Sequence, residues 1–236
     1  MGTFCRNTSK CLLPVGSETL LARVIRQIAE AGAVREIVVI VRSGERNIPA
    51  AIGNRCGAVS VRYCAQKPWA AGPVGAAYSA GVPGECGETV LIALGDEYYD
   101  GLLFPDFIRE HERPGFAVSA ALYRAESSEQ IRKNYTVALT KDFRILRAVE
   151  KPAEPLSPFA GCGAMLISGP YFKQFRERHS GGLSGCEMVS WINEAVESGL
   201  DCHGFVFSGR YRNVNTVGDY LTVCRMENEK AVSAAE

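Results

Sequence analysis

Two uninterrupted apolar runs limit what this chain can fold into. The run EIVVIV at 36–41 and the run TVLIAL at 89–94 show no alternation of polar and apolar residues. Such runs are typical of strands in a parallel sheet that helices cover on both faces. The first run follows a segment of helical period at 20–31, with a cap at Ser17 and a stop at Gly32. A helix followed by a buried strand predicts βαβ winding.

The same two periodicities predict the remaining elements. Further strands are expected at 59–64, 116–123, 135–139, 144–150, 163–168 and 202–207, with a hairpin turn at Lys141-Asp142. Further helices are expected at 74–80, 171–179, 187–198 and from Thr216 to about Lys230. The predicted class is α/β: a Rossmann-like, doubly wound mixed sheet in three layers, α/β/α. A length of 236 residues suits one domain over 1–236.

Composition argues against several classes of protein. The 26 Lys and Arg residues balance the 26 Asp and Glu residues, so no positive surplus is available for a nucleic-acid backbone. The apolar runs are far shorter than the ~20 residues of a membrane span. The first residues show no secretory signal, so the expected location is the cytoplasm, without a membrane partner. Nine cysteines without a CxxC pair are expected to be reduced, buried thiols rather than disulfides or zinc ligands.

Three segments carry groups that suit phosphate chemistry. Lys10, in TSKCLLPV, offers a point positive charge to a phosphate. Asp96 follows the run at 89–94, and ligands of open α/β sheets bind outside the carboxyl ends of strands. A carboxylate at that place suits Mg²⁺. The glycine-rich segment from Gln66 to Gly75 opens a helix whose free N–H groups can bind a base or a phosphate, although an ordinary loop is the alternative.

Two later segments extend this set. Glu150-Lys151-Pro152 places a cation beside a carboxylate, which suits a phosphate and a hydroxyl of one sugar-like molecule. In the segment YRNVNT at 211–216, the amide oxygens of Asn213 and Asn215 could complete a metal site. Taken alone, either segment could instead be solvent-exposed chain at the edge of the fold.

The order of all these segments resembles the sugar-phosphate nucleotidyltransferase family, which includes proteins like glucose-1-phosphate thymidylyltransferase and phosphocholine cytidylyltransferase. That family runs from a P-K-x-L-L-P-V segment through a Gly-Asp strand end and a Glu-Lys-Pro turn to a closing D-x-G-T segment. The counterparts here are residues 9–15, 95–96, 150–152 and 213–216. The resemblance covers roughly residues 2 to 225. It implies a GT-A-like fold, with a nucleotide-binding half at about 1–115 and an acceptor-binding half at about 116–236.

The resemblance also implies a reaction and roles for residues. An oxygen of a phosphorylated small molecule would attack the α-phosphorus of a nucleoside triphosphate, and pyrophosphate would leave, with Mg²⁺ as cofactor. Lys10 and Asp96 would be catalytic. The implied binding residues are Gly2, Thr3, Gln66, Gly72 and Gly95 for the nucleotide, Glu150, Lys151 and Gly163 for the second substrate, and Asp96, Asn213 and Asn215 for the metal. The sequence leaves open whether the protein forms a homo-oligomer.

The chain departs from the family pattern at two places. The family begins with a buried strand and a G-x-G-T-R loop, of which Gly2-Thr3 would be the remnant, with Phe4 in place of the arginine and Arg6 as a substitute. A start recorded about ten residues late, a degenerate non-catalytic relative, or another segment filling the gap would each account for this. At the second place, Asn213 stands where the family has a metal-binding aspartate, and an amide is a weaker, uncharged ligand.

Three functions compete on these observations. The first is a nucleotidyltransferase for a sugar phosphate or a related phospho-compound. The second is a non-catalytic relative that still binds a nucleotide or a sugar phosphate. The third is a glycosyltransferase, which would normally carry an Asp-x-Asp metal pair, whereas this chain has Asp96-Glu97-Tyr98. The ordered set of segments favours the first.

Overall fold

The computed structural model describes residues 9–68, 70, 72–79, 87–112, 115–179 and 187–233. Its helices are η1, a 3-10 turn (Lys10–Leu12), α1 (Leu20–Ala29), α2 (Asn47–Ile52), α3 (Gly72–Ser79), α4 (Phe104–His111), α5 (Ser128–Arg132), α6 (Gly169–Arg178), α7 (Met188–Glu197) and α8 (Val217–Ser233). Its strands are β1 (Pro14–Val15), β2 (Glu18–Thr19), β3 (Glu36–Val41), β4 (Arg55–Cys56), β5 (Val59–Ala65), β6 (Val90–Ala93), β7 (Glu97–Asp100), β8 (Phe116–Arg124), β9 (Tyr135–Leu139), β10 (Ile145–Glu150), β11 (Phe159–Ile167), β12 (Asp201–Phe207) and β13 (Arg210–Asn213). Gly2 and Thr3 lie outside the described residues.

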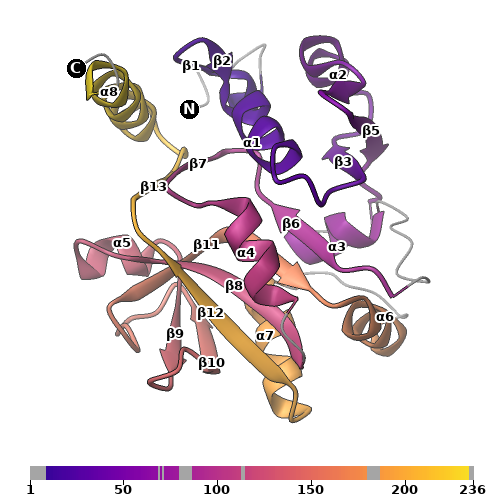
Figure 1. Ribbon diagram of the computed structural model, residues 1–236, viewed down its shortest axis with the longest axis vertical. Coiled ribbons are helices and arrows are strands. Elements are labelled where there is room, and N and C mark those ends of the chain that lie inside the picture. Colours follow the sequence, from indigo (N-terminus) through magenta and orange to yellow (C-terminus); the bar gives the residue numbers. More distant parts are fainter. Residues whose placement is uncertain are drawn as a thin grey trace.

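The main sheet has six strands, in the order β10-β9-β11-β8-β12, with β6 also paired to β11 (Figure 1). Strand β12 runs parallel to β8, whereas β6, β8 and β9 run antiparallel to β11. A separate three-stranded sheet has the order β3-β5-β4, with β3 parallel to β5. Strands β7 and β13 form an antiparallel pair of their own. This mixed α/β architecture confirms the fold class expected from the sequence.

Helices cover both faces of the main sheet. On one face, Val118 and Leu122 of β8 pack with Phe175 of α6 and Trp191 of α7. On the other face, side chains of β8 and β11 pack with Phe104 and Phe107 of α4 and with Val24 and Ile28 of α1. Successive residues of a strand point to opposite faces, which is why the apolar run of β8 is buried along almost its whole length.

Two details expected from the sequence need correction, the cap of α1 and the start of β11. Helix α1 begins at Leu20 and is capped by Thr19, whose hydroxyl accepts from the N–H of Ala22 at 3.3 Å. Ser17 is not the cap, because the chain there turns between the paired strands β1 and β2. Strand β11 begins at Phe159, four residues before its expected start, because its first residues already pair with β8 and β9.

Strand β3 differs from expectation in its burial. The sequence predicts a strand covered on both faces, yet Glu36 is exposed and the other five residues of β3 are only half-buried. All four residues of β6 are half-buried as well. Each of these strands pairs with one neighbour only, β5 and β11 respectively, so one edge of each lacks a strand partner within the described residues.

Among the described helices, none combines the length and the apolar character that crossing a bilayer requires.

Candidate active site

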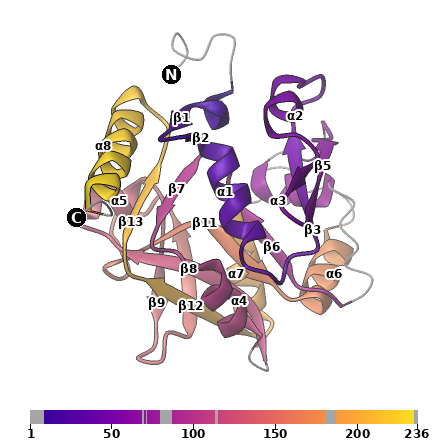
Figure 2. The same ribbon diagram turned by 45° about the horizontal axis from the view of Figure 1, so that its top comes forward.

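Lys10, Asp96 and Asn215 meet although they are far apart in the sequence. Lys10 lies in η1, and its Nζ forms an ion pair with Oδ2 of Asp96. The same Nζ donates a hydrogen bond to Oδ1 of Asn215 at 2.8 Å. Figure 2 shows the β1–β2 hairpin and α1 beside β7 and β13. Asp96 comes immediately before β7, and Asn215 comes two residues after the end of β13. The structure therefore brings together three of the residues singled out in the sequence.

Strand pairing explains why the closing segment reaches Asp96. Asp96 lies between β6 and β7, and β7 pairs with β13 in a register that sets Glu97 opposite Asn213. The N–H of Val214 then donates to the carbonyl oxygen of Asp96 at 3.0 Å. Asn213 and Asn215 therefore lie on either side of Val214, whose backbone is hydrogen-bonded to that of Asp96.

Glu97 is a buried carboxylate that ties three strands together. It accepts hydrogen bonds from the hydroxyls of Tyr99 and Tyr211, both at 2.6 Å, and from the N–H of Gly163 at 2.7 Å. Burial raises the pKa of Glu97 to about 7, and the charge of Asp96 adds to the effect. Sequence reasoning gave this residue no role. The sequence signal that could have revealed this role is the spacing of Glu97 and Tyr99, because residues two positions apart in a strand lie on the same face.

The side-chain oxygen atoms at this place are of the kind that Mg²⁺ prefers. Asp96 supplies a carboxylate, and Oδ1 of Asn213 is buried without a hydrogen-bond partner. Oδ1 of Asn215 is occupied by Lys10. No group of three or more His, Cys, Asp or Glu side chains forms a metal cluster in the part of the chain that the structure describes. Mg²⁺ is commonly held by one or two carboxylates and completes its shell with water and substrate phosphates, so this donor set is compatible with it.

A polar cavity of about 410 Å³ adjoins these residues. It is lined by Tyr123, Gln130, Arg132, Lys133, Asn134, Lys151, Tyr211, Arg212, Asn213, Asn215, Thr216 and Asp219. Four of these side chains are cationic, against one carboxylate. That carboxylate, Asp219, already accepts hydrogen bonds from Asn215 and Thr216. The cavity is therefore positive and suits a phosphate or another anion.

Lys151 lies in this cavity, whereas Glu150 does not line it. The N–H of Lys151 donates to the carbonyl oxygen of Asn134 at 2.8 Å, which holds Lys151 at a φ of 42° at the end of β10. Its Nζ is 3.9 Å from Oε1 of Glu150. Burial raises the pKa of Glu150, with a further contribution from Glu187. Of the predicted acceptor-binding pair, the structure places the lysine with Asn213 and Asn215.

Two of the predicted nucleotide-binding residues, Gln66 and Gly72, lie shortly before α3 and at its first position. Nε2 of Gln66 donates to the carbonyl oxygen of Ala70 at 2.7 Å, so this side chain folds back on its own loop. Gly72 begins α3 with a φ of 79°. A Cβ at Gly75 would lie 2.5 Å from the carbonyl carbon of Ala70, so this position requires glycine. Contact between this segment and a base stays a prediction.

Packing also accounts for Gly95 and Gly163. A Cβ at Gly95 would lie 2.8 Å from Cδ1 of Leu21. A Cβ at Gly163 would lie 2.5 Å from Cγ of Leu94 and 2.7 Å from Oε2 of Glu97. Protein side chains thus fill the space beside both glycines, and their contacts with substrates stay predictions.

The sequence matches a known family over most of its length. The family model that describes a MobA-like NTP transferase domain matches residues 1–166. This chain belongs to that family. The matched residues include Lys10 and Asp96, and the membership confirms the resemblance to nucleotidyltransferases.

Two individual proteins are similar to this chain. The glucose-1-phosphate thymidylyltransferase of Streptomyces griseus is 27% identical over 229 residues, which are 93% of this chain and 60% of that protein. The chain thus spans about three-fifths of the length of this relative. A solved Bacillus anthracis protein, assigned as a glucose-1-phosphate thymidylyltransferase and in complex with a sucrose, superposes with a TM-score of 0.81 at 17% identity. That match covers 96% of this chain and 89% of the other. At 17% identity, the likeness to this solved structure shows a similar fold and nothing further.

Proposed function

We propose that this MobA-like NTP transferase transfers a nucleoside monophosphate from a nucleoside triphosphate to a phosphorylated small molecule and releases pyrophosphate. The observation that carries the proposal is the convergence of Lys10, Asp96 and Asn215 beside a cationic cavity of about 410 Å³. Phosphoryl chemistry of this kind depends on positioning and on neutralisation of charge. A lysine, a carboxylate and a positive cavity supply both.

The residues divide the work between the two substrates. Arg132, Lys133, Lys151 and Arg212 hold the acceptor phosphate, whose oxygen attacks the α-phosphorus while the bond to the β-phosphate oxygen breaks. Lys10 neutralises charge on the triphosphate as pyrophosphate leaves. Asp96 and Asn213 would hold Mg²⁺, which would further neutralise charge on the phosphates.

The substrate panel begins with a sugar phosphate. The curated relative is named for glucose 1-phosphate and a thymidine nucleotide, so we propose this pair first, followed by the other nucleoside triphosphates and by phosphorylated alcohols. A reducing compartment such as the cytoplasm suits the free thiols of the cysteines within the described residues.

Asp96→Asn tests the mechanism, with pyrophosphate release as the measurement. The carboxylate that pairs with Lys10 and would bind Mg²⁺ is lost, so kcat should fall by about a hundredfold or more, in the range typical for loss of one group that stabilises the transition state. Asp100→Asn is the matched control, because Asp100 ends β7, the strand that Asp96 immediately precedes, and also pairs with a lysine, which is Lys230 and not Lys10. Equal rates for the two variants would contradict the role of Asp96.

The second candidate is a non-catalytic protein that still binds a nucleotide or a sugar phosphate. It is favoured by the amide of Asn213 where the family has a carboxylate, since one carboxylate alone binds Mg²⁺ more weakly than two. Nucleotide and sugar-phosphate binding by calorimetry, without pyrophosphate release across the whole panel, would establish this alternative.

A further inference from the structure

We propose that Asn215 is a positioning residue for the ammonium group of Lys10 and not a ligand of the metal. Lys10 leaves Asp96 when Mg²⁺ binds there, and it stays hydrogen-bonded to Asn215, which keeps the ammonium group beside the cationic cavity. This inference rests on the proposed function, because it concerns how Lys10 and Mg²⁺ share one carboxylate.

The two asparagines of the closing segment have different partners. Oδ1 of Asn213 is buried without a hydrogen-bond partner, so it is available to a metal ion. Oδ1 of Asn215 accepts a hydrogen bond from Nζ of Lys10 at 2.8 Å. A divalent cation on that same oxygen would lie close to the ammonium group and be repelled by it. The geometry therefore gives the lysine to Asn215 and leaves Asn213 for the metal.

One apolar cluster holds the backbones that carry Lys10, Asp96 and Asn215. It includes residues that follow Lys10 and Asp96 closely in the sequence, and the neighbour of Asn215. Its buried members are Leu13, Val15, Leu20, Tyr98, Val214 and Val223. Moving any of these backbones would disturb a packed cluster, whereas the long, flexible side chain of a lysine rotates freely. The exchange therefore needs only a movement of the Lys10 side chain.

The start of α8 fixes Asn215 in place. Oδ2 of Asp219 accepts hydrogen bonds from the N–H of Asn215 at 3.2 Å and from the N–H of Thr216 at 2.9 Å. The N–H of Asp219 donates in turn to Oγ1 of Thr216 at 3.1 Å, as in a reciprocal helix cap. Asn215 also lines the cationic cavity, which Lys10 does not. Asn215 therefore connects the lysine to the cavity.

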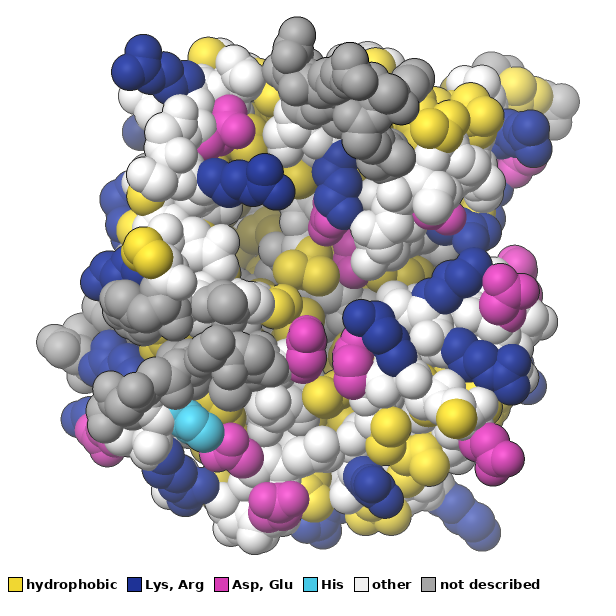
Figure 3. Space-filling model, turned by 180° about the vertical axis from the view of Figure 1, so that it is seen from behind, with side chains coloured by type: hydrophobic (Ala, Val, Ile, Leu, Met, Phe, Trp, Pro, Cys, Tyr) yellow, Lys and Arg dark blue, Asp and Glu magenta, His cyan; other side chains and the backbone are white. Residues whose placement is uncertain are grey.

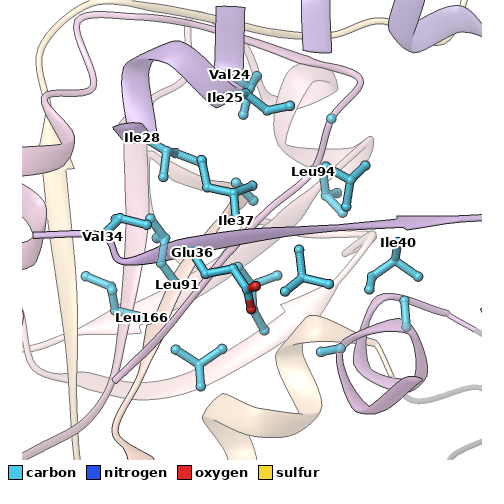
Figure 4. A pocket seen from close by; sticks show the side chains of 18 of the residues that line it. Val24, Ile25, Ile28, Val34, Glu36, Ile37, Ile40, Leu91, Leu94 and Leu166 are labelled. Carbon is cyan, nitrogen blue, oxygen red and sulfur yellow. The ribbon is translucent and has the colours of Figure 1, made fainter. Parts of the chain in front are cut away.

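An apolar cavity of about 600 Å³ limits where the displaced ammonium group can go. Figure 3 shows hydrophobic side chains inside a hollow on the back of the molecule. Figure 4 shows the cavity from close by, with Leu94 among the side chains on its walls. Cys11 and Gly95, the sequence neighbours of Lys10 and Asp96, line this cavity as well. An ammonium group would lose water there without gaining a hydrogen bond from the apolar walls, so the polar side of the site is the favourable direction.

Electrostatics favours an exchange over a shared carboxylate. An ammonium group and Mg²⁺ on the same Asp96 would repel each other. The exposed fractions of the Lys10 and Asp96 side chains are 33% and 21%, and an ion pair that water reaches is weak enough to be replaced. The amide of Asn215 carries no charge, so it holds the ammonium group without neutralising it. Lys10 then keeps its full positive charge for the triphosphate.

The experiment is a double-mutant cycle on metal affinity. The probe is Mn²⁺ alone, which prefers the same oxygen ligands as Mg²⁺, and free Mn²⁺ is measured by electron paramagnetic resonance. It is titrated into the unsubstituted chain, Lys10→Met, Asn215→Ala and the variant with both substitutions. Lys151→Met is the matched control for the loss of one positive charge, because Lys151 lines the cavity and lies near Glu150, whereas Lys10 pairs with Asp96.

We expect Lys10→Met to tighten Mn²⁺ binding by up to about fivefold, and by more than Lys151→Met does, because the metal no longer has to displace an ion pair. Asn215→Ala should weaken Mn²⁺ binding by about two- to fivefold in the chain that has Lys10, because the displaced ammonium group loses its acceptor. In the Lys10→Met chain, Asn215→Ala should leave the affinity for Mn²⁺ unchanged. A direct bond from Asn215 to the metal, or a general structural role, would act equally in both chains.

Equal effects of Asn215→Ala with and without Lys10 would therefore overturn the proposal. Tightening by Lys10→Met that is no greater than that by Lys151→Met would overturn it too, and so would an unsubstituted chain that binds no Mn²⁺. Pyrophosphate release is measured in parallel on the same chains. Coupled Mn²⁺ binding without release would leave the exchange of Lys10 standing and count against the proposed function, and release without coupling would do the reverse.

Discussion

At the scale of single residues, Glu97 shows how one side chain sets the geometry of a site. Its three donors belong to β7, β13 and β11, and Asp96 and Asn213 are held by the same strands. Three donors converging on one carboxylate leave no place for an amide group that must itself donate. The residue thus holds its neighbours in position without being expected to touch a substrate.

Glu97→Gln should lower the free energy of unfolding by about 1–3 kcal/mol, because one buried donor loses its acceptor. Urea unfolding measures the change. Glu36→Gln is the matched control, since Glu36 pairs with Arg62 on the surface, where such a pair contributes at most about 1 kcal/mol. If both variants lose the same small amount, the three hydrogen bonds of Glu97 do not stabilise the fold as inferred.

His111 makes the protein sensitive to acid. It is buried on α4, and its Nδ1 lies 2.8 Å from Oγ of Ser119. Burial, together with the nearby His203, lowers the pKa of His111 to about 4 from its ordinary value of 6.5. The unfolded chain therefore binds the proton more tightly, and stability is lost as the pH falls from about 6.5 toward 4, by up to about 3 kcal/mol.

In His111→Gln the loss of stability between pH 6.5 and pH 4 that is due to His111 should disappear. The free energy of unfolding at pH 7 should change less than the free energy of unfolding at pH 4. Urea unfolding of both proteins at a series of pH values between 4 and 7 gives the comparison. An unchanged slope in the variant would show that other groups cause the acid sensitivity.

At the scale of elements, α3 depends on one close crossing. Gly75 lies against the backbone of Ala70, so Gly75→Ala should displace the loop or the helix and cost about 1–3 kcal/mol, as overpacking of a tight contact does. Gly218→Ala is the matched control, because its nearest atom, Oγ1 of Thr216, is 3.6 Å away and a helix prefers alanine. Thermal unfolding of both variants is the measurement, and a Gly75 variant as stable as the control would contradict the crossing.

Local periodicity predicted the elements that carry a full apolar face. Strand β9 and helix α7 were placed within one residue at each end because their patterns extend over the whole element. Helix α4 was missed: it has eight residues, a proline in its first turn and few apolar positions. Strands β7 and β13 were missed as well, because they are short and are stabilised by pairing with each other across more than a hundred residues.

Local sequence patterns also limited how much of the candidate site could be predicted. Lys10 and Asp96 were chosen for their motifs and for the end of a strand, and their ion pair agrees with that choice. Of the residues that line the cationic cavity, the sequence analysis had singled out Lys151, Asn213 and Asn215. Arg132 and Arg212 reach it from α5 and β13, and no local pattern encodes which loops a sheet brings together.

At the scale of the whole molecule, no strand pairing within the described residues joins the six-stranded sheet to the β3-β5-β4 sheet, and side chains connect them instead. The β3-β5-β4 sheet is held through α1, where Leu21 and Ile25 pack with Ile48 and Val61. The six-stranded sheet has the larger core, on two faces. A region with fewer buried contacts opens at a lower free energy than the rest of the protein.

We therefore expect amides of β5 to exchange through a smaller opening than those of β8. Native-state hydrogen exchange at increasing urea concentrations should show a lower opening free energy and a smaller denaturant dependence for β5. Equal values for the two strands would mean that the molecule unfolds as one cooperative unit.

The contact between Lys10 and Asn215 has a consequence for biosynthesis. The ribosome makes Lys10 first, and more than two hundred residues follow before its partner exists. The nascent protein can acquire sheets and helices while it emerges, since folding proceeds from the amino terminus during synthesis. The site itself must wait until residue 215 has left the exit tunnel. An unfinished polypeptide therefore carries Lys10 without the asparagine that holds it.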